Sequence, residues 1–164
     1  MGKTFIRVDD RLIHGQIAVA WAQTLSVQEI IAFDDQTASN KMLQQIMLMG
    51  VSKAYNPKIL SFQESEAALK TSITGNRLVI VRSCEHLEKI IPYIDQLELV
   101  YLGNIQKTQN SKYNLSQGAG GVLFFSDQDI ETIDRLDAQG IKFVLQMVPS
   151  SSSRTWEQAK KSFK

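Results

Sequence analysis

The chain has 164 residues and a mass of 18.5 kDa, and 43% of its residues are hydrophobic. This is enough apolar material for one compact core, so a single domain over residues 1–164 is expected. The balance of 18 Lys and Arg against 17 Asp and Glu excludes a polybasic nucleic-acid surface and an acidic disordered tail. No uncharged apolar run reaches about 18 residues, so no direct membrane insertion is expected.

The lone cysteine, Cys84, restricts the chemistry further. One cysteine cannot form an internal disulfide or a cysteine zinc cluster, which favours a reducing, cytoplasmic location. No metal site and no cofactor site is indicated by the sequence.

The first half of the chain alternates between predicted strands and helices. Residues 4–8 favour a strand, and apolar residues at helical spacing follow over 15–25. A buried strand is expected at 29–33 and a helix over 41–49, stopped by Gly50. Side chains of that second helix are expected in the core, with Met42, Leu43 and Ile46 facing inward and Met47 and Met49 filling gaps.

The alternation continues to the end of the chain. Further strands are expected at 58–60, 77–82, 98–102, 122–125 and 141–148. Further helices are expected at 61–70, 83–94 with a kink at Pro92, 126–140 and 156–163. Ser61 and Glu64 fit a capping box at the start of the first of these helices, and Ser83 is the expected cap of the second. The glycine-rich stretch 118–121 lacks the lysine of a phosphate loop and is interpreted as a turn.

Strands separated by helices need crossover connections. The pattern therefore predicts an α/β fold: an open, mostly parallel, doubly wound sheet of about six or seven strands with helices on both faces. Ligand sites in such sheets lie beyond the carboxyl ends of the strands. The residues of interest are those that follow predicted strands, namely 9–16, 34–35, 83–84 and 103–104.

The loop at 9–16 contains the most candidate reactive residues. In it, His14 directly precedes a predicted helix and lies three residues after Arg11. A neutral imidazole is a good nucleophile, since its ordinary pKa of about 6.5 leaves it often deprotonated near pH 7. The amides that open a helix, with an arginine, can receive phosphate oxygens, and Gly15 lets backbone approach closely. This arrangement indicates a histidine that attacks phosphorus.

The segment RVDDRLIHGQ at 7–16 resembles the active-site segment of the enzyme IIB components of mannose-type bacterial sugar phosphotransferase systems, whose members also handle sorbose, fructose and amino sugars. The acidic turn at 33–35, the glycine turn at 103–105 and the stretches 127–139 and 140–149 are similar to the same family, so the resemblance covers nearly the whole chain.

The resemblance implies a role for each residue of the site. His14 would be the phosphoryl carrier, Arg11, Gly15 and Gln16 would hold the phosphate, and Asp10 would orient the loop or Arg11. Three further residues would flank the pocket and support it: Asp34, Asp35 and Gly103.

The resemblance also implies a sequence of partners. A IIA protein would load Nδ1 of His14 from its own phosphohistidine. The group would then pass to a sugar brought in by the membrane components IIC and IID, on the cytoplasmic side. Arginine and amide donors can stabilise such a transfer, so no metal is needed.

Two other functions fit parts of the sequence. Asp9 or Asp10 could bind Mg²⁺ and accept phosphate as in a receiver-like signalling module, although no acceptor aspartate follows the strand at 58–60. The His14 loop could also bind an anion without catalysis. Arg7, inside the first strand, is interpreted as an edge residue, as a counter-ion to an aspartate or as a direct phosphate ligand.

Overall fold

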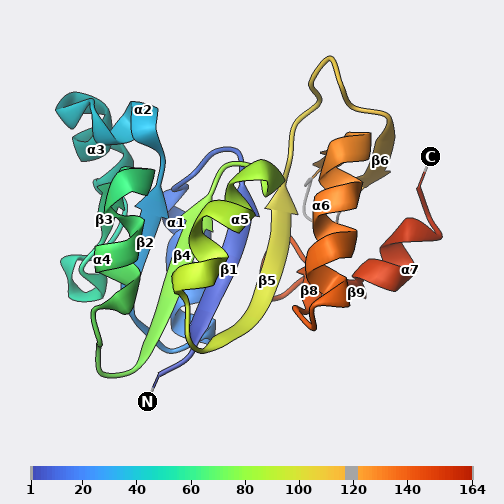
Figure 1. The fold of residues 1–164 in the computed structure, drawn as a ribbon. Helices are drawn as coiled ribbons and strands as arrows, with labels where there is room; N and C mark the ends of the chain where they lie inside the picture. The colour runs from blue at the N-terminus through green and yellow to red at the C-terminus, as the bar shows by residue number, and fades with distance from the viewer. Residues whose placement is uncertain (1, 117–121, 164) are drawn as a thin grey trace.

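A computed structural model describes residues 2–116 and 122–163 (Figure 1). The turn expected at 118–121 lies outside these residues. Within them, no helix is both long and apolar enough to cross a membrane.

The strands of the described residues form one large sheet and one small one (Figure 1). The seven-stranded sheet has the order β3-β2-β4-β1-β5-β8-β9, and its neighbours pair in parallel except for β8 and β9. Its strands are β1 (Thr4–Asp9), β2 (Val27–Phe33), β3 (Lys58–Leu60), β4 (Asn76–Val81), β5 (Leu97–Asn104), β8 (Phe143–Leu145) and β9 (Arg154–Thr155). The small antiparallel sheet pairs β6 (Tyr113–Ser116) with β7 (Val122–Phe125).

Helices connect the consecutive strands from β1 to β5 and connect β7 to β8, as predicted. The α-helices are α1 (Gly15–Thr24), α2 (Asp35–Ala38), α3 (Lys41–Leu48), α4 (Ser65–Lys70), α5 (Leu87–Ile90), α6 (Asp127–Ala138) and α7 (Trp156–Lys160). Short 3₁₀ turns are η1 (Lys53–Tyr55), η2 (Phe62–Glu64), η3 (Cys84–His86) and η4 (Ile91–Tyr93).

Two apolar cores lie on opposite faces of the large sheet, because successive strand residues point to opposite sides. In β1, Ile6 and Val8 belong to the core that α4, α5 and α6 cover. Phe5 belongs to the core that contains Trp21 of α1, against which Met47 of α3 also packs. Figure 1 shows α5 in front of the sheet and α1 behind it. The predicted doubly wound α/β architecture is confirmed.

Local sequence signals explain where several helices begin. Ser61 and Glu64 form a capping box, as the sequence predicts. Ser126 and Asp129 form another in front of α6, and Thr155 caps α7 in the same way. The predicted cap at Ser83 is wrong, because its side chain accepts no capping bond.

The inward face predicted for the second helix is wrong. Met42, Ile46 and Met49 are exposed, and α3 has no fully buried residue. The helix packs against the core through Met47, as expected, and through Leu48. Apolar residues surround this helix on more than one side, so periodicity alone could not fix the buried face.

The carboxyl-terminal half differs from the prediction in its strands. β6 lies in a stretch where no strand was expected, and it pairs with β7 outside the large sheet. The strand expected at 141–148 is only three residues long, and β9 was not predicted. The helix expected at 83–94 is divided into η3, α5 and η4, with Pro92 at the start of η4.

Candidate active site

The loop between β1 and α1 lies at the carboxyl end of a central strand. β1 ends at Asp9 between β4 and β5, and α1 begins at Gly15. His14 occupies the N-cap position of α1 in extended conformation, and its side chain is exposed and makes no capping hydrogen bond. The imidazole is therefore presented to solvent beside the first amides of a ten-residue helix.

Two apolar side chains anchor this loop. Leu12 and Ile13 are buried in the core beneath α1, whereas His14 and Gln16 are exposed. Leu12 has a φ of 62°, a left-handed conformation that is costly for a residue with a side chain. Its amide donates to the carbonyl of Asp9 at 2.9 Å, which closes a tight turn. Burial of the leucine side chain thus holds a strained turn directly before the histidine.

Asp9 is shared by two arginines. Its Oδ1 accepts from Nε of Arg11 at 3.0 Å, and its Oδ2 accepts from Nη2 of Arg11 at 2.8 Å, which is a bidentate pair. Oδ2 also accepts from Nη2 of Arg7 at 3.3 Å. One carboxylate between two guanidiniums gives the cluster a net charge of +1. The hydrogen bonds that Arg11 donates to Asp9 raise the pKa of Arg11, whose side chain remains 28% exposed.

Arg7 is enclosed by protein. Its side chain is 2% exposed and donates to the carbonyls of Gln146 and Met147 at 3.1 and 2.9 Å. Its guanidinium also lies over the ring of Trp21. Burial lowers the pKa of Arg7 to about 10, although Asp9 opposes the shift. The interpretation as a counter-ion fits this geometry; the interpretations as an edge residue and as a direct phosphate ligand do not.

Asp10 fastens the loop to the end of β5. Its Oδ1 accepts from Nδ2 of Asn104 at 2.8 Å, and its Oδ2 accepts from the amide of Gln106 at 2.7 Å. The amide of Asp10 donates to the carbonyl of Asn104 at 2.9 Å. Of the two roles expected for Asp10, it orients the loop, while Asp9 orients Arg11.

Arg82 links this loop to the end of β2, a role that the sequence analysis missed. It follows β4, which lies between β1 and β2 in the sheet. Its Nη1 donates to the carbonyl of Asp10 at 2.6 Å, and its Nε lies 3.2 Å from Oδ2 of Asp34. Its Nη2 donates to the hydroxyl of Thr37 at 3.2 Å. The available signal was an arginine placed directly after a strand.

The two predicted acidic supports have different surroundings. Asp34 caps α2 and accepts from the amide and the hydroxyl of Thr37 at 3.1 and 2.6 Å. Burial acts to raise the pKa of Asp34, but the hydrogen bonds from Thr37 and the charge of Arg82 outweigh it, so the pKa is lowered. Asp35 is exposed and accepts from the amide of Phe62, which directs it toward the turn after β3. Only Asp34 joins the network of the His14 loop.

The two glycines of the predicted site make room for other groups. A Cβ on Gly15 would lie 3.1 Å from Cα and O of Gly50, so α1 and the end of α3 meet there at close range. A Cβ on Gly103 would lie 2.3 Å from Nη2 of Arg7. Both glycines therefore allow close packing beside the loop.

The geometry does not favour a receiver-like site. Asp9 is 2% exposed and bound by two arginines, and both carboxylate oxygens of Asp10 accept hydrogen bonds. A phosphoacceptor aspartate must be reachable and free to bind Mg²⁺. Neither carboxylate has that freedom.

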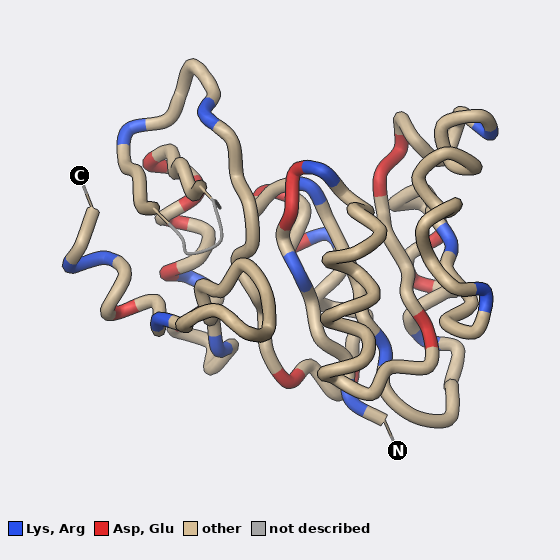
Figure 2. The backbone as a smooth tube through the Cα atoms, turned by 180° about the vertical axis from the view of Figure 1, so that it is seen from behind, with Lys and Arg blue, Asp and Glu red and all other residues tan. Residues whose placement is uncertain are grey.

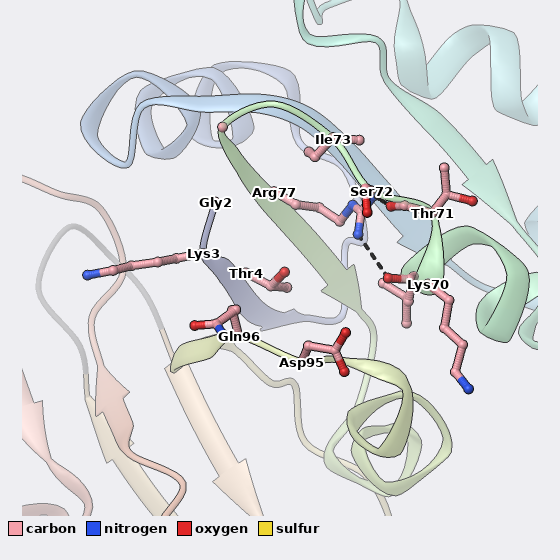
Figure 3. A pocket seen from close by; sticks show the side chains of 12 residues that line it. Gly2, Lys3, Thr4, Lys70, Thr71, Ser72, Ile73, Arg77, Asp95 and Gln96 are labelled. Atoms are coloured by element: carbon pink, nitrogen blue, oxygen red, sulfur yellow. Dashed lines mark hydrogen bonds between the residues drawn. The ribbon is translucent and has the colours of Figure 1, made fainter.

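A pocket at the opposite end of the strands is separate from this site (Figure 3). It lies at the amino ends of the strands, between Thr4, Ser72 and Asp95, and Arg77 donates to the carbonyls of Leu69 and Thr71 beside it. His14 follows the carboxyl end of β1, so the pocket lies far along the strands from the imidazole. Among the described residues, basic and acidic positions are scattered over both halves of the backbone (Figure 2).

Comparison with known proteins identifies the family of the chain. A family model described as the PTS system sorbose subfamily IIB component matches residues 3–163. A probable phosphotransferase enzyme IIB component of Streptococcus pyogenes is 33% identical over 110 residues, which are 66% of this chain and 68% of that protein. The mannose-specific EIIAB component of Escherichia coli is 21% identical over 144 residues, which are 87% of this chain but 43% of that longer protein.

The fold is also found among solved structures. The IIBSor domain of the sorbose permease from Klebsiella pneumoniae superposes with a TM-score of 0.82 at 19% identity, covering 99% of this chain and 98% of that one. The family model spans nearly the entire chain and includes the His14 loop. The chain belongs to the sorbose subfamily of PTS IIB components, the phosphotransferase components of mannose-family sugar uptake.

Proposed function

We propose that His14 is the phosphoryl carrier of this IIB component and that residues 1–164 form one phosphocarrier domain. One observation carries the proposal: the imidazole of His14 is exposed at the N-cap of α1, three residues after Arg11. Arg11 shares the carboxylate of Asp9 with Arg7, so these three side chains together have a net positive charge. An exposed nucleophile beside cationic and amide donors is what transfer of a phosphoryl group requires.

The loading step exchanges one P–N bond for another. Nδ1 of His14 attacks the phosphorus of a phosphohistidine on a IIA partner, and the donor imidazole leaves with the electron pair of the broken bond. The two nitrogens are chemically alike, so the step is close to balanced in free energy. The protein's contribution is alignment and stabilisation of the negative charge on the phosphoryl oxygens.

Phosphate is held by Arg11 and by the amides of Gly15 and Gln16. The first turn of α1 contains no acidic residue, so nothing there offsets the positive end of the helix dipole. Arg7 already neutralises much of the charge on Asp9, so Arg11 can turn part of its guanidinium toward a new anion without leaving the carboxylate unpaired.

The remaining predicted residues act as supports. Asp10 and Asp34 hold the loop through Asn104 and Arg82. Gly103 supports it indirectly, by admitting the guanidinium of Arg7. Asp35 is assigned to the turn after β3 and acts on the site only through α2.

The unloading step passes the group to a sugar. A hydroxyl oxygen of the sugar attacks phosphorus, the P–N bond to His14 breaks, and the departing imidazole nitrogen or solvent takes the hydroxyl proton. We assign the sugar to the membrane components IIC and IID, at the cytoplasmic face of the membrane. The name of the longer mannose-specific relative, EIIAB, joins an A and a B component, which supports IIA as the donor.

Intact-mass measurement tests the proposal. The protein is incubated with phosphoenolpyruvate, the two general phosphotransferase proteins and candidate IIA proteins. The wild type should gain one phosphoryl group that is labile in acid, and His14→Ala should gain none. A non-catalytic anion-binding domain would give no mass increase in either protein, and equal phosphorylation of both proteins would assign the group to another residue.

A further inference from the structure

The turn that follows β8 contacts both of the arginines that share Asp9. The carbonyls of Gln146 and Met147 accept from Arg7 at 3.1 and 2.9 Å. Sδ of Met147 lies 3.9 Å from Nη2 of Arg11. Met147 is itself buried, so a segment about 140 residues further along the chain borders both guanidiniums.

The side chain of Gln146 shapes this turn. Its backbone amide donates to the carbonyl of Leu102 at 3.2 Å, next to the last paired residue of β8. Its Nε2 donates to the carbonyls of Pro149 and Ser151 at 3.2 and 2.9 Å. The amide and the hydroxyl of Ser151 both donate to the carbonyl of Val148, at 3.1 and 2.8 Å. These bonds fix how the chain leaves the sheet, and with it the two carbonyls that accept from the buried arginine.

The hold on Arg7 determines how Asp9 is shared. Nη2 of Arg7 lies 2.9 Å from the carbonyl of Met147 but 3.3 Å from Oδ2 of Asp9. Arg11 meets the same carboxylate through two nitrogens, at 3.0 and 2.8 Å. A buried guanidinium needs acceptors, so without these carbonyls Arg7 would move toward Oδ2 and compete with Arg11 for it. The turn therefore leaves the carboxylate to Arg11.

We propose that Gln146 is a positioning residue for phosphoryl transfer to His14, an inference that rests on the function proposed for that histidine. Its carboxamide shapes the turn, the turn holds Arg7, and the carboxylate of Asp9 is left to orient Arg11. The carboxamide thus acts on the reaction through the placement of a guanidinium that meets the phosphoryl oxygens.

A double-mutant cycle on the loading step tests this role. Gln146→Met removes both carboxamide bonds with little change in side-chain length. It should lower kcat for loading from phosphorylated IIA by roughly tenfold and change the KM for IIA by less than about twofold, because it misplaces a phosphate ligand inside the site. In an Arg11→Ala background it should have no further effect on kcat, since no guanidinium is left to position. An equal loss in both backgrounds would overturn the proposal, as would an unchanged kcat in the single variant.

Asn76 provides the matched control for a loss of stability. Like Gln146, it is a partly buried carboxamide with two bonds to the backbone: its Nδ2 donates to the carbonyl of Leu25 at 2.8 Å, and its Oδ1 accepts from the amide of Lys3 at 2.9 Å. It begins β4, so it lies at the amino ends of the strands. Asn76→Leu should lower the free energy of unfolding in urea and leave kcat at the wild-type value. A comparable loss of kcat in this variant would show that destabilisation alone slows transfer, and would overturn the proposal.

Ser151→Ala is a second variant, which keeps the test decisive if Gln146→Met does not fold. It removes the hydroxyl that bonds to Val148, so it should lower kcat to a smaller extent, again only while Arg11 is present.

Phosphoramidate, a small phosphoryl donor, separates this inference from the proposed function. Failure of both phosphoramidate and IIA to label His14 in the wild type would remove the proposed function, and this inference with it. Labelling of the Gln146 and Ser151 variants as fast as the wild type, by either donor, would overturn only the positioning role.

Discussion

The backbone of Gly103 lies directly against the guanidinium of Arg7. A Cβ at position 103 would lie 2.3 Å from Nη2 and 2.4 Å from Cζ of that arginine. The same guanidinium donates to Asp9, which in turn holds Arg11. A glycine at the end of β5 is thus connected to the candidate phosphate ligand through two charged side chains.

Gly103→Ala should displace Arg7 and destabilise the fold. Since the new methyl group overlaps a buried, tightly bonded side chain, the free energy of unfolding should fall by about 1–3 kcal/mol in urea titrations. In an Arg7→Met background the same substitution should cost clearly less. Equal costs in both backgrounds would show that the glycine is needed for another reason.

Replacement of Arg11 should slow transfer to His14. Arg11→Ala should reduce the rate of loading from IIA by roughly 10²-fold, because a cationic donor to the phosphoryl oxygens is lost. Arg11→Lys should lose less, since the charge remains although the planar fork is gone. Rapid-quench measurement of phosphorylated protein gives the three rates, and equal rates would reject the assignment of Arg11.

Arg82 should act as a positioning residue. Arg82→Met removes its three contacts, to Asp10, Asp34 and Thr37, and should lower kcat for loading by up to about 10²-fold with little change in the KM for IIA. Phosphoramidate labelling of His14 should slow as well, since the loop itself is misplaced. If only the free energy of unfolding changes, the contacts of Arg82 are purely structural.

The lowered pKa of Asp34 predicts a pH dependence of stability. The unfolded chain has the ordinary value near 3.8, and the folded chain has a lower one, so the carboxylate stabilises the fold above pH 3.8. This contribution should be lost as the pH falls from that value through the lowered pKa. Unfolding free energies measured between pH 7 and pH 2 should decrease less steeply over the acid range for Asp34→Asn than for the wild type. Parallel curves would contradict the shift.

Much of the fold was predictable because it depends on local signals. The capping box at Ser61 and Glu64 and the strand at 4–8 follow from neighbouring residues, and both are confirmed. The exposed face of α3 could not be predicted, because apolar residues lie on more than one of its sides and only tertiary packing selects Met47 and Leu48. β9 is only two residues long and forms by pairing with β8, so no local sequence pattern predicts it.

In the candidate site, too, local features could be predicted from the sequence, whereas features that depend on strand order could not. The exposed position of His14 in front of α1 follows from a strand, a loop and a helix in sequence. The role of Arg82 depends on β4 lying between β1 and β2, which is a property of strand order and not of any local motif. The sequence could not show which aspartate pairs with Arg11, because Asp9 and Asp10 are adjacent and carry the same charge. The structure pairs Arg11 with Asp9.

The most direct test is a single-turnover chase of protein labelled with ³²P at His14. Labelled protein, freed of IIA and phosphoenolpyruvate, is mixed with membranes that contain IIC and IID and with a transported sugar. Label should leave His14 and appear as sugar phosphate in equal amount, with no such product from His14→Ala carried through the same steps. Label that remains on the protein, or that appears only as inorganic phosphate while the membranes are active with another IIB component, would contradict the role proposed for His14.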